Sequence, residues 1–89
     1  MELPKKFFNL KKGTKLKINN KIYTIKEVTK YPAQNKHESK YMGYDLGDNY
    51  FLEYDFSWNF FKLETKKGFF GFETTRNKNI KIEEIKISS

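Results

Sequence analysis

Residues 15–25 read Lys15-Leu16-Lys17-Ile18-Asn19-Asn20-Lys21-Ile22-Tyr23-Thr24-Ile25. Leu16 and Ile18 alternate with lysines, and this period is typical of a strand with one buried face. The two asparagines that follow predict a tight turn, because asparagine tolerates the positive φ that such turns require. We therefore expect a β-hairpin here, whose second strand runs from about residue 22 to residue 31.

A second hairpin is predicted further along the chain. Its strands are residues 41–46 and 50–56, and Gly47-Asp48-Asn49 supply the turn. The stretch between the two hairpins, residues 32–40, opens with a proline, is polar and has no apolar periodicity, so it predicts an exposed loop. The chain's single histidine, His37, lies in this loop with no second histidine beside it, and we expect no catalytic role for it.

The C-terminal part of the chain also alternates between short strands and polar connections. Residues 60–65 and 69–74 predict two further strands separated by a turn at residues 66–68, and a bend at residues 57–59 precedes them. Residues 75–79 are polar and predict a loop. The alternation in residues 80–87 changes phase at a doubled glutamate, and a bulge at that point would keep the segment one strand.

The number of strands sets the fold class. Six or seven short strands in 89 residues predict an all-β, mainly antiparallel fold, either a small curled barrel or a two-layer sandwich. We expect one domain over residues 1–89, with residues 1–10 leading into the first strand. Residues 13–25 resemble the opening strands of SH3-like small barrels. That resemblance implies a binding module and assigns no binding residue.

Composition excludes several classes of chemistry. The chain has no cysteine, which excludes disulfides, thiolate catalysis and cysteine-based metal sites. No glycine pattern matches a phosphate-binding loop, and the acidic residues lack the spacing of a calcium loop. We therefore expect no enzymatic activity, no metal and no cofactor. Residues 1–8 lack the apolar run of a signal peptide, and no segment approaches the length of about 18 apolar residues that spans a bilayer. The sequence thus predicts a cytoplasmic protein with no membrane partner.

The net charge of +7 is unevenly distributed along the chain. Residues 1–40 carry a balance of +8, residues 41–65 a balance of −4 and residues 66–89 a balance of +3. If these segments occupy different sides of the fold, one surface attracts polyanions and another repels them. The alternative interpretation is that the lysines reflect an AT-rich genome and keep the surface soluble.

The combination of lysines with aromatic residues indicates the leading functional hypothesis, a non-catalytic module that binds nucleic acid through its basic N-terminal hairpin. In such modules lysines follow the phosphates and aromatic rings stack on the bases. The candidate phosphate-binding residues are Lys11, Lys12, Lys15, Lys17, Lys21 and Lys26. The candidate stacking residues are Tyr23, Tyr31 and Tyr41.

The competing hypothesis is a protein-interaction or assembly module of an accessory or viral kind. Such a module would use an exposed aromatic patch or a free sheet edge. Its candidate contacts are Tyr54 and Trp58. Trp58 lies at the predicted bend, where it is interpreted either as a buried anchor or as an exposed contact. No pattern in the sequence indicates an oligomeric state.

Overall fold

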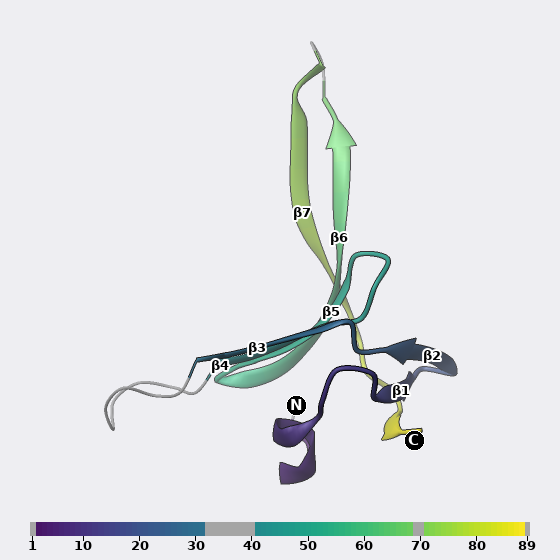
Figure 1. Cartoon of the computed structure of the whole chain (residues 1–89). Helices are drawn as coiled ribbons and strands as arrows, with labels where there is room; N and C mark the ends of the chain where they lie inside the picture. Colours follow the sequence, from purple (N-terminus) through teal and green to yellow (C-terminus); the bar gives the residue numbers. More distant parts are fainter. Residues whose placement is uncertain (1, 32–40, 69–70, 89) are drawn as a thin grey trace.

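The computed structural model describes residues 2–31, 41–68 and 71–88 of the chain. This part of the chain contains one short 3-10 helix and eight β-strands, which form two antiparallel sheets (Figure 1). The all-β, mainly antiparallel prediction is confirmed. The sheets do not close into a barrel, so the chain adopts the open, two-sheet alternative. The loop predicted at residues 32–40, with its histidine, lies outside the described residues.

The smaller sheet has the strand order β2-β1-β8. β1 (Lys15–Ile18) and β2 (Lys21–Thr24) form the first predicted hairpin. Its two turn residues, Asn19 and Asn20, have φ angles of 49° and 70°, the left-handed values that a two-residue turn needs to match the twist of its strands. β8 (Ile85–Ile87) pairs with the other edge of β1.

The larger sheet has the strand order β3-β4-β5-β6-β7. Its strands are β3 (Glu27–Tyr31), β4 (Tyr41–Asp45), β5 (Tyr50–Asp55), β6 (Ser57–Lys67) and β7 (Glu73–Ile80). β4 and β5 form the second predicted hairpin, in which Tyr44 lies opposite Leu52. The strand predicted for residues 60–65 lies within β6, which also takes in residues 66 and 67 of the predicted turn. The strand predicted for residues 69–74 overlaps β7 only at residues 73 and 74, and residues 69–70 lie outside the described residues.

The single strand predicted for residues 22–31 is wrong, because the chain changes sheets within it. The Ile25 amide donates to the Thr14 carbonyl at 2.9 Å, which continues the smaller sheet. The next amide, that of Lys26, donates to the Asp45 carbonyl at 2.7 Å, which begins the larger sheet. Ile25 at the crossing is 1% exposed. The apolar residues on both faces of this run therefore serve two different sheets.

Three further local predictions in the C-terminal part are wrong. Residues 57–59 are not a bend, and residues 75–79 are not a loop, because they belong to β6 and β7. The chain reverses one residue earlier, at Phe56, whose φ is 63°. The strand predicted for residues 80–87 is divided between β7 and β8, which lie in different sheets. The strand at residues 75–79 was missed because a ribbon whose residues are exposed has no apolar alternation to mark it.

The two sheets share one hydrophobic cluster. Leu16 and Ile18 of β1 belong to the same buried cluster as Tyr44 and Leu52 of the larger sheet, and all four are 0% exposed. The 3-10 helix η1 (Lys5–Asn9) adds the Phe7 ring, which meets Trp58 edge-on at 6.5 Å. The core thus lies between the smaller sheet with η1 on one side and a single face of the larger sheet on the other.

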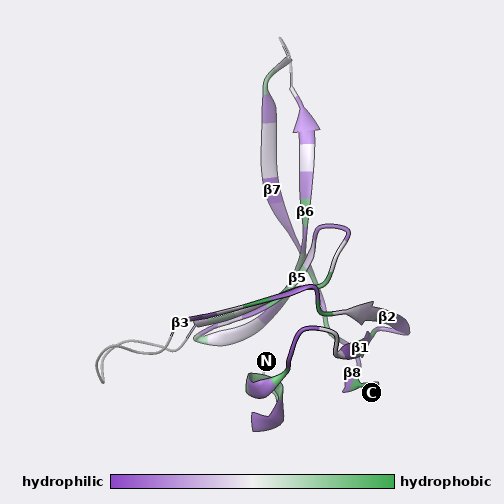
Figure 2. Cartoon of the chain, viewed as in Figure 1, coloured by the Kyte–Doolittle hydropathy of each residue, from purple (hydrophilic) through white to green (hydrophobic). Residues whose placement is uncertain are grey.

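The outer halves of β6 and β7 project from this body as a two-stranded arm (Figure 1). The arm is mainly hydrophilic, as Figure 2 shows along the distal parts of both strands. Residues 73–79 are all exposed. At the base of the arm, the Leu63 amide donates to the Asn49 carbonyl in the β4–β5 turn at 2.8 Å. We use the word arm below for residues 64–67 and 73–77.

Candidate polyanion interface

The smaller sheet places three lysines on its outward side. Side chains alternate along a strand, so the burial of Leu16 and Ile18 turns Lys15 and Lys17 outward. β8 brings a third lysine, because Lys86 lies directly opposite Lys17 in the antiparallel register. We call the outward side chains of Lys15, Lys17 and Lys86 the basic face.

The basic face carries charge that no described residue neutralises through an ion pair. Strands β1, β2 and β8 contain no aspartate or glutamate. Among the described residues, the ion pairs join Lys12, Arg76 and Lys78 to glutamates, and none includes a lysine of the basic face. Like charges directly opposite each other across two strands destabilise a sheet. The Lys17–Lys86 pair is therefore an arrangement that a bound anion would stabilise.

An exposed apolar residue lies on the same side. Ile22 of β2 is opposite Lys17 in the register and is 60% exposed. The outward side of the smaller sheet thus combines an apolar residue on the edge strand β2 with cations in β1 and β8. This combination suits a ligand that has both charged and apolar parts.

The other predicted phosphate-binding lysines are not gathered at this face. Lys12 donates to Glu27 Oε1 at 3.2 Å and so belongs to an ion pair with β3. Lys26 lies at the crossing between sheets, and its aliphatic stem approaches Gly47. Lys21 begins β2 in register with Ile18, on the side opposite to Lys17. Lys11 is exposed in the segment that leads from η1 to β1.

Tyr23 has an inward position. Its ring lies 5.2 Å from that of Tyr50 and 5.6 Å from that of Phe60, and it packs against the core. Burial, with a smaller contribution from the nearby Tyr50, raises the pKa of Tyr23. The structure therefore places Tyr23 on the opposite side of the sheet from the basic face.

The two residues predicted for a protein partner are also packed inside. Trp58 is 3% exposed, so its interpretation as an exposed contact is wrong and that as a buried anchor is the one observed. Tyr54 is half-buried, with its ring 5.4 Å from Trp58 and 4.9 Å from Phe8. Both rings face the core because the register of β5 and β6 places them opposite each other on the covered face of the sheet.

The face of the larger sheet that points away from the core is acidic over β3, β4 and β5, and the stacked rings of Phe51 and the buried Phe61 share it. The register of β3, β4 and β5 places four carboxylates on this face: Glu27, Asp45, Glu53 and Asp55. No lysine or arginine of these three strands shares it. Because the core lies between the sheets, this acidic face and the basic face point away from each other. The charge segregation seen along the sequence is therefore a segregation in space.

Lys86 is the residue of this interface that sequence reasoning missed. The alternation Ile85-Lys86-Ile87 repeats that of Leu16-Lys17-Ile18, and it is the signal that would have turned Lys86 outward. The pairing of β8 with β1 joins segments more than sixty residues apart, and no local pattern specifies it.

Comparison with family models, curated proteins and solved structures yields no match. Within the part of the chain that the structure describes, no group of three or more acidic or histidine side chains is arranged to hold a metal ion. In the same residues, no helix has the length and apolarity that crossing a membrane requires. The function is therefore inferred from the chain's own geometry and charge.

Proposed function

We propose that this chain is a non-catalytic module that binds nucleic acid through the basic face. The observation that carries the proposal is the Lys17–Lys86 pair, two cations in register on a sheet without acidic residues. Phosphates of a nucleic acid would neutralise both lysines and Lys15 beside them, and the release of counterions favours such binding. Ile22 on the same side offers an apolar contact for a sugar or a base.

The acidic face supports the proposal that nucleic acid binds at the basic face. A polyanion is repelled by Glu27, Asp45, Glu53 and Asp55 and attracted by the opposite side of the molecule. Binding is therefore expected at one side only, with contacts to phosphates that do not depend on base sequence.

The test is fluorescence anisotropy with labelled mixed-sequence single-stranded DNA, RNA and duplex DNA at about 50 and 200 mM salt. Three phosphate contacts predict that affinity falls about twentyfold for single strands and about fortyfold for duplex over this range. Lys17→Glu with Lys86→Glu is expected to abolish binding. The matched control is Lys66→Glu with Lys67→Glu, which changes the net charge equally but lies on the arm.

Two results would contradict the proposal. One is no binding of any oligonucleotide at the lower salt concentration. The other is an equal loss of binding in both charge-reversal variants, which would show that net charge rather than the basic face attracts the ligand.

A second candidate function, the protein-interaction or assembly module, is favoured by the edge of β7. In the described structure β7 pairs only with β6, and seven of its eight residues are exposed. An unpaired edge of this length is a template for strand addition by another chain. This candidate predicts concentration-dependent self-association that persists in the Lys17→Glu, Lys86→Glu variant, measured by sedimentation velocity. A monomer at all concentrations would contradict assembly through this edge.

A further inference from the structure

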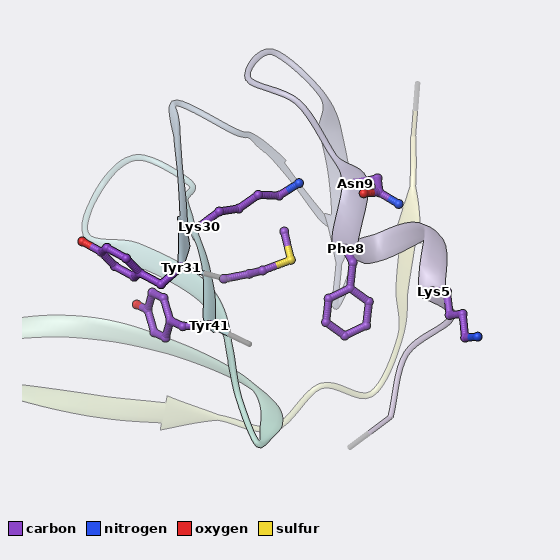
Figure 3. Close-up of a pocket in the computed structure, with 7 residues that line it drawn as sticks. Lys5, Phe8, Asn9, Lys30, Tyr31 and Tyr41 are labelled. Atoms are coloured by element: carbon purple, nitrogen blue, oxygen red, sulfur yellow. The ribbon is translucent and has the colours of Figure 1, made fainter. Parts of the chain in front are cut away.

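A cavity of about 550 Å³ opens between η1 and the β3–β4 pair. Its size falls within the range of about 300 to 1,000 Å³ that is typical of small-molecule sites. Figure 3 shows Phe8 and Asn9 of η1 on one side and Lys30 of β3 on the other, with Lys30 extending toward Asn9. This cavity lies apart from the outward side of β1, β2 and β8.

The interior of the cavity is apolar. Phe8 forms one wall, and its ring is held from behind by Tyr54 at 4.9 Å and Trp58 at 5.2 Å. Met42 lies under the opposite wall, since it pairs with Lys30 in the register, shares its face of the sheet and is 1% exposed. The ring of Phe8 is therefore the surface on which a planar ring can stack.

The rim of the cavity is cationic. Lys5 and Lys30 both line it, and no carboxylate of residues 2–31, 41–68 or 71–88 does. Neither lysine forms an ion pair with a described residue. The Asn9 side chain adds an amide that is able to donate a hydrogen bond to an oxygen. The cavity therefore suits a ligand in which a planar ring carries an anionic group.

We infer that this cavity is a nucleotide site, in which a base stacks on Phe8 and its phosphate binds Lys30, with Lys5 and Asn9 at the rim. If the nucleotide belongs to a bound nucleic-acid strand, this inference rests on the proposed function. The same chemistry also fits a free nucleoside monophosphate. Lys11 lies in the segment that joins η1 to β1, between the cavity and the basic face along the chain.

The stacking residue of this site is Phe8 rather than the predicted tyrosines. Tyr31 and Tyr41 pair with each other in register, one position beyond Lys30 and Met42, so they point to the other face of the sheet. Figure 3 shows these two rings together on the opposite side of the strands from Lys30. They border the cavity without facing its interior.

Trp58 provides the readout. It is the chain's single tryptophan and its ring lies 5.2 Å from that of Phe8, so we expect a ligand that stacks on Phe8 to change its fluorescence. Adenosine monophosphate is titrated first, with adenosine as the uncharged comparison. We expect saturable binding of the monophosphate and about tenfold weaker binding of adenosine, since a charged hydrogen bond is lost.

The variant Lys30→Gln tests the cation directly. Lys30 is exposed, so the substitution leaves the core intact, and we expect about tenfold weaker binding of the monophosphate. Lys6→Gln is the matched control, because Lys6 lies in η1 but does not line the cavity. The absence of saturable binding, or equal weakening in both variants, would overturn the inference.

Oligonucleotide binding by the same variants separates this inference from the proposed function. If Lys30→Gln binds a single strand as tightly as the wild type and the monophosphate does not bind, the site is overturned and the proposed function stands. If the monophosphate binds with the expected dependence on Lys30 but no oligonucleotide does, the site stands as one for free nucleotides and the proposed function fails.

Discussion

Tyr44 shows how a single buried hydroxyl attaches the N-terminal segment to the larger sheet. Its side chain is 0% exposed. The hydroxyl donates to the Phe7 carbonyl and accepts from the Leu10 amide at 3.3 Å. Burial raises the pKa of Tyr44, while the hydrogen bond from Leu10 lowers it. The residue therefore stays protonated and holds η1 over the core and beside the cavity.

Tyr44→Phe is expected to destabilise the protein by about 1 to 3 kcal/mol, because the Phe7 carbonyl loses its partner in a buried position. Denaturant unfolding measures this loss as a lower midpoint with an unchanged slope. Tyr31→Phe is the matched control, since Tyr31 is 64% exposed, and its effect is expected within about 0.5 kcal/mol. Equal stability of the two variants would contradict the role of the Tyr44 hydroxyl.

Tyr41 predicts a change of stability at high pH. Its hydroxyl donates to Glu53 Oε2 at 2.8 Å. Burial, followed by this hydrogen bond and the charge of Glu53, raises the pKa of Tyr41 to about 12, above the ordinary value of about 10. The unfolded chain thus releases this proton at lower pH than the folded chain. The stabilisation is complete below pH about 10 and is lost as the pH rises to about 12.

Glu53→Gln is expected to lower the pKa of Tyr41, while burial, the larger cause, keeps it above the ordinary value. An ultraviolet titration of the tyrosinate signal measures this pKa, and the difference between wild type and Tyr41→Phe assigns it. Identical titrations of wild type and Glu53→Gln would show that the carboxylate does not act on Tyr41.

At the scale of elements, Asn19 joins the first hairpin to the C-terminal strand. Its side-chain amide donates to the Lys81 carbonyl at 2.8 Å. Its Oδ1 accepts from the amides of Glu83 and Glu84 at 2.8 and 3.2 Å. These bonds fix the backbone immediately before β8, and so they help to set the register that brings Lys86 opposite Lys17.

Asn19→Ala is expected to destabilise the protein by about 1 to 2 kcal/mol, because three hydrogen bonds are lost and alanine tolerates the positive φ at this position less well than asparagine. It should also broaden the amide resonances of Ile85 and Ile87, because β8 is held less firmly. Asn20→Gly is the control: glycine accepts the positive φ at this position, and the change is expected within about 0.5 kcal/mol. If Asn19→Ala leaves both stability and the β8 resonances unchanged, the side-chain hydrogen bonds of Asn19 are not needed to hold β8 in register.

The elements that sequence reasoning found are those with a local cause. The turns at residues 19–20 and 47–49 have left-handed residues that asparagine, aspartate and glycine accept, and alternation marked the strands beside them. The crossing at Ile25 and the strand β7 have no such local mark. The first is a change of sheet within one apolar run, and the second is stabilised by pairing with β6 rather than by burial.

The prediction of the interface was also limited to those residues whose position has a local cause in the sequence. The outward positions of Lys15 and Lys17 follow from the period of one strand. Lys86 joins them through a long-range pairing that alternation alone does not encode. Phe8 was overlooked as a cavity wall because its position depends on how η1 packs against Trp58.

At the scale of the whole molecule, charge and stability are distributed over different parts. The basic face and the acidic face lie on opposite sides of a core formed by the two sheets. The arm takes no part in that core. Its ion pairs, Arg76–Glu64 at 3.3 Å and Lys78–Glu64 at 3.8 Å, involve cations that are more than 60% exposed, and such pairs contribute little stability.

Native-state hydrogen exchange is expected to distinguish the arm from the core in stability. Amides of the arm have few buried contacts and should exchange through local fraying, whereas amides at the centre of β4 and β5 should exchange only on global unfolding. Low denaturant concentrations will therefore accelerate exchange in β4 and β5 and leave exchange in the arm nearly unchanged. The boundary should fall near Leu63, where the hydrogen bond to Asn49 joins β6 to the body. Equal protection of the arm and of β4 would mean that the arm unfolds only with the core, and its exposed edge would then be a rigid surface rather than a fraying one.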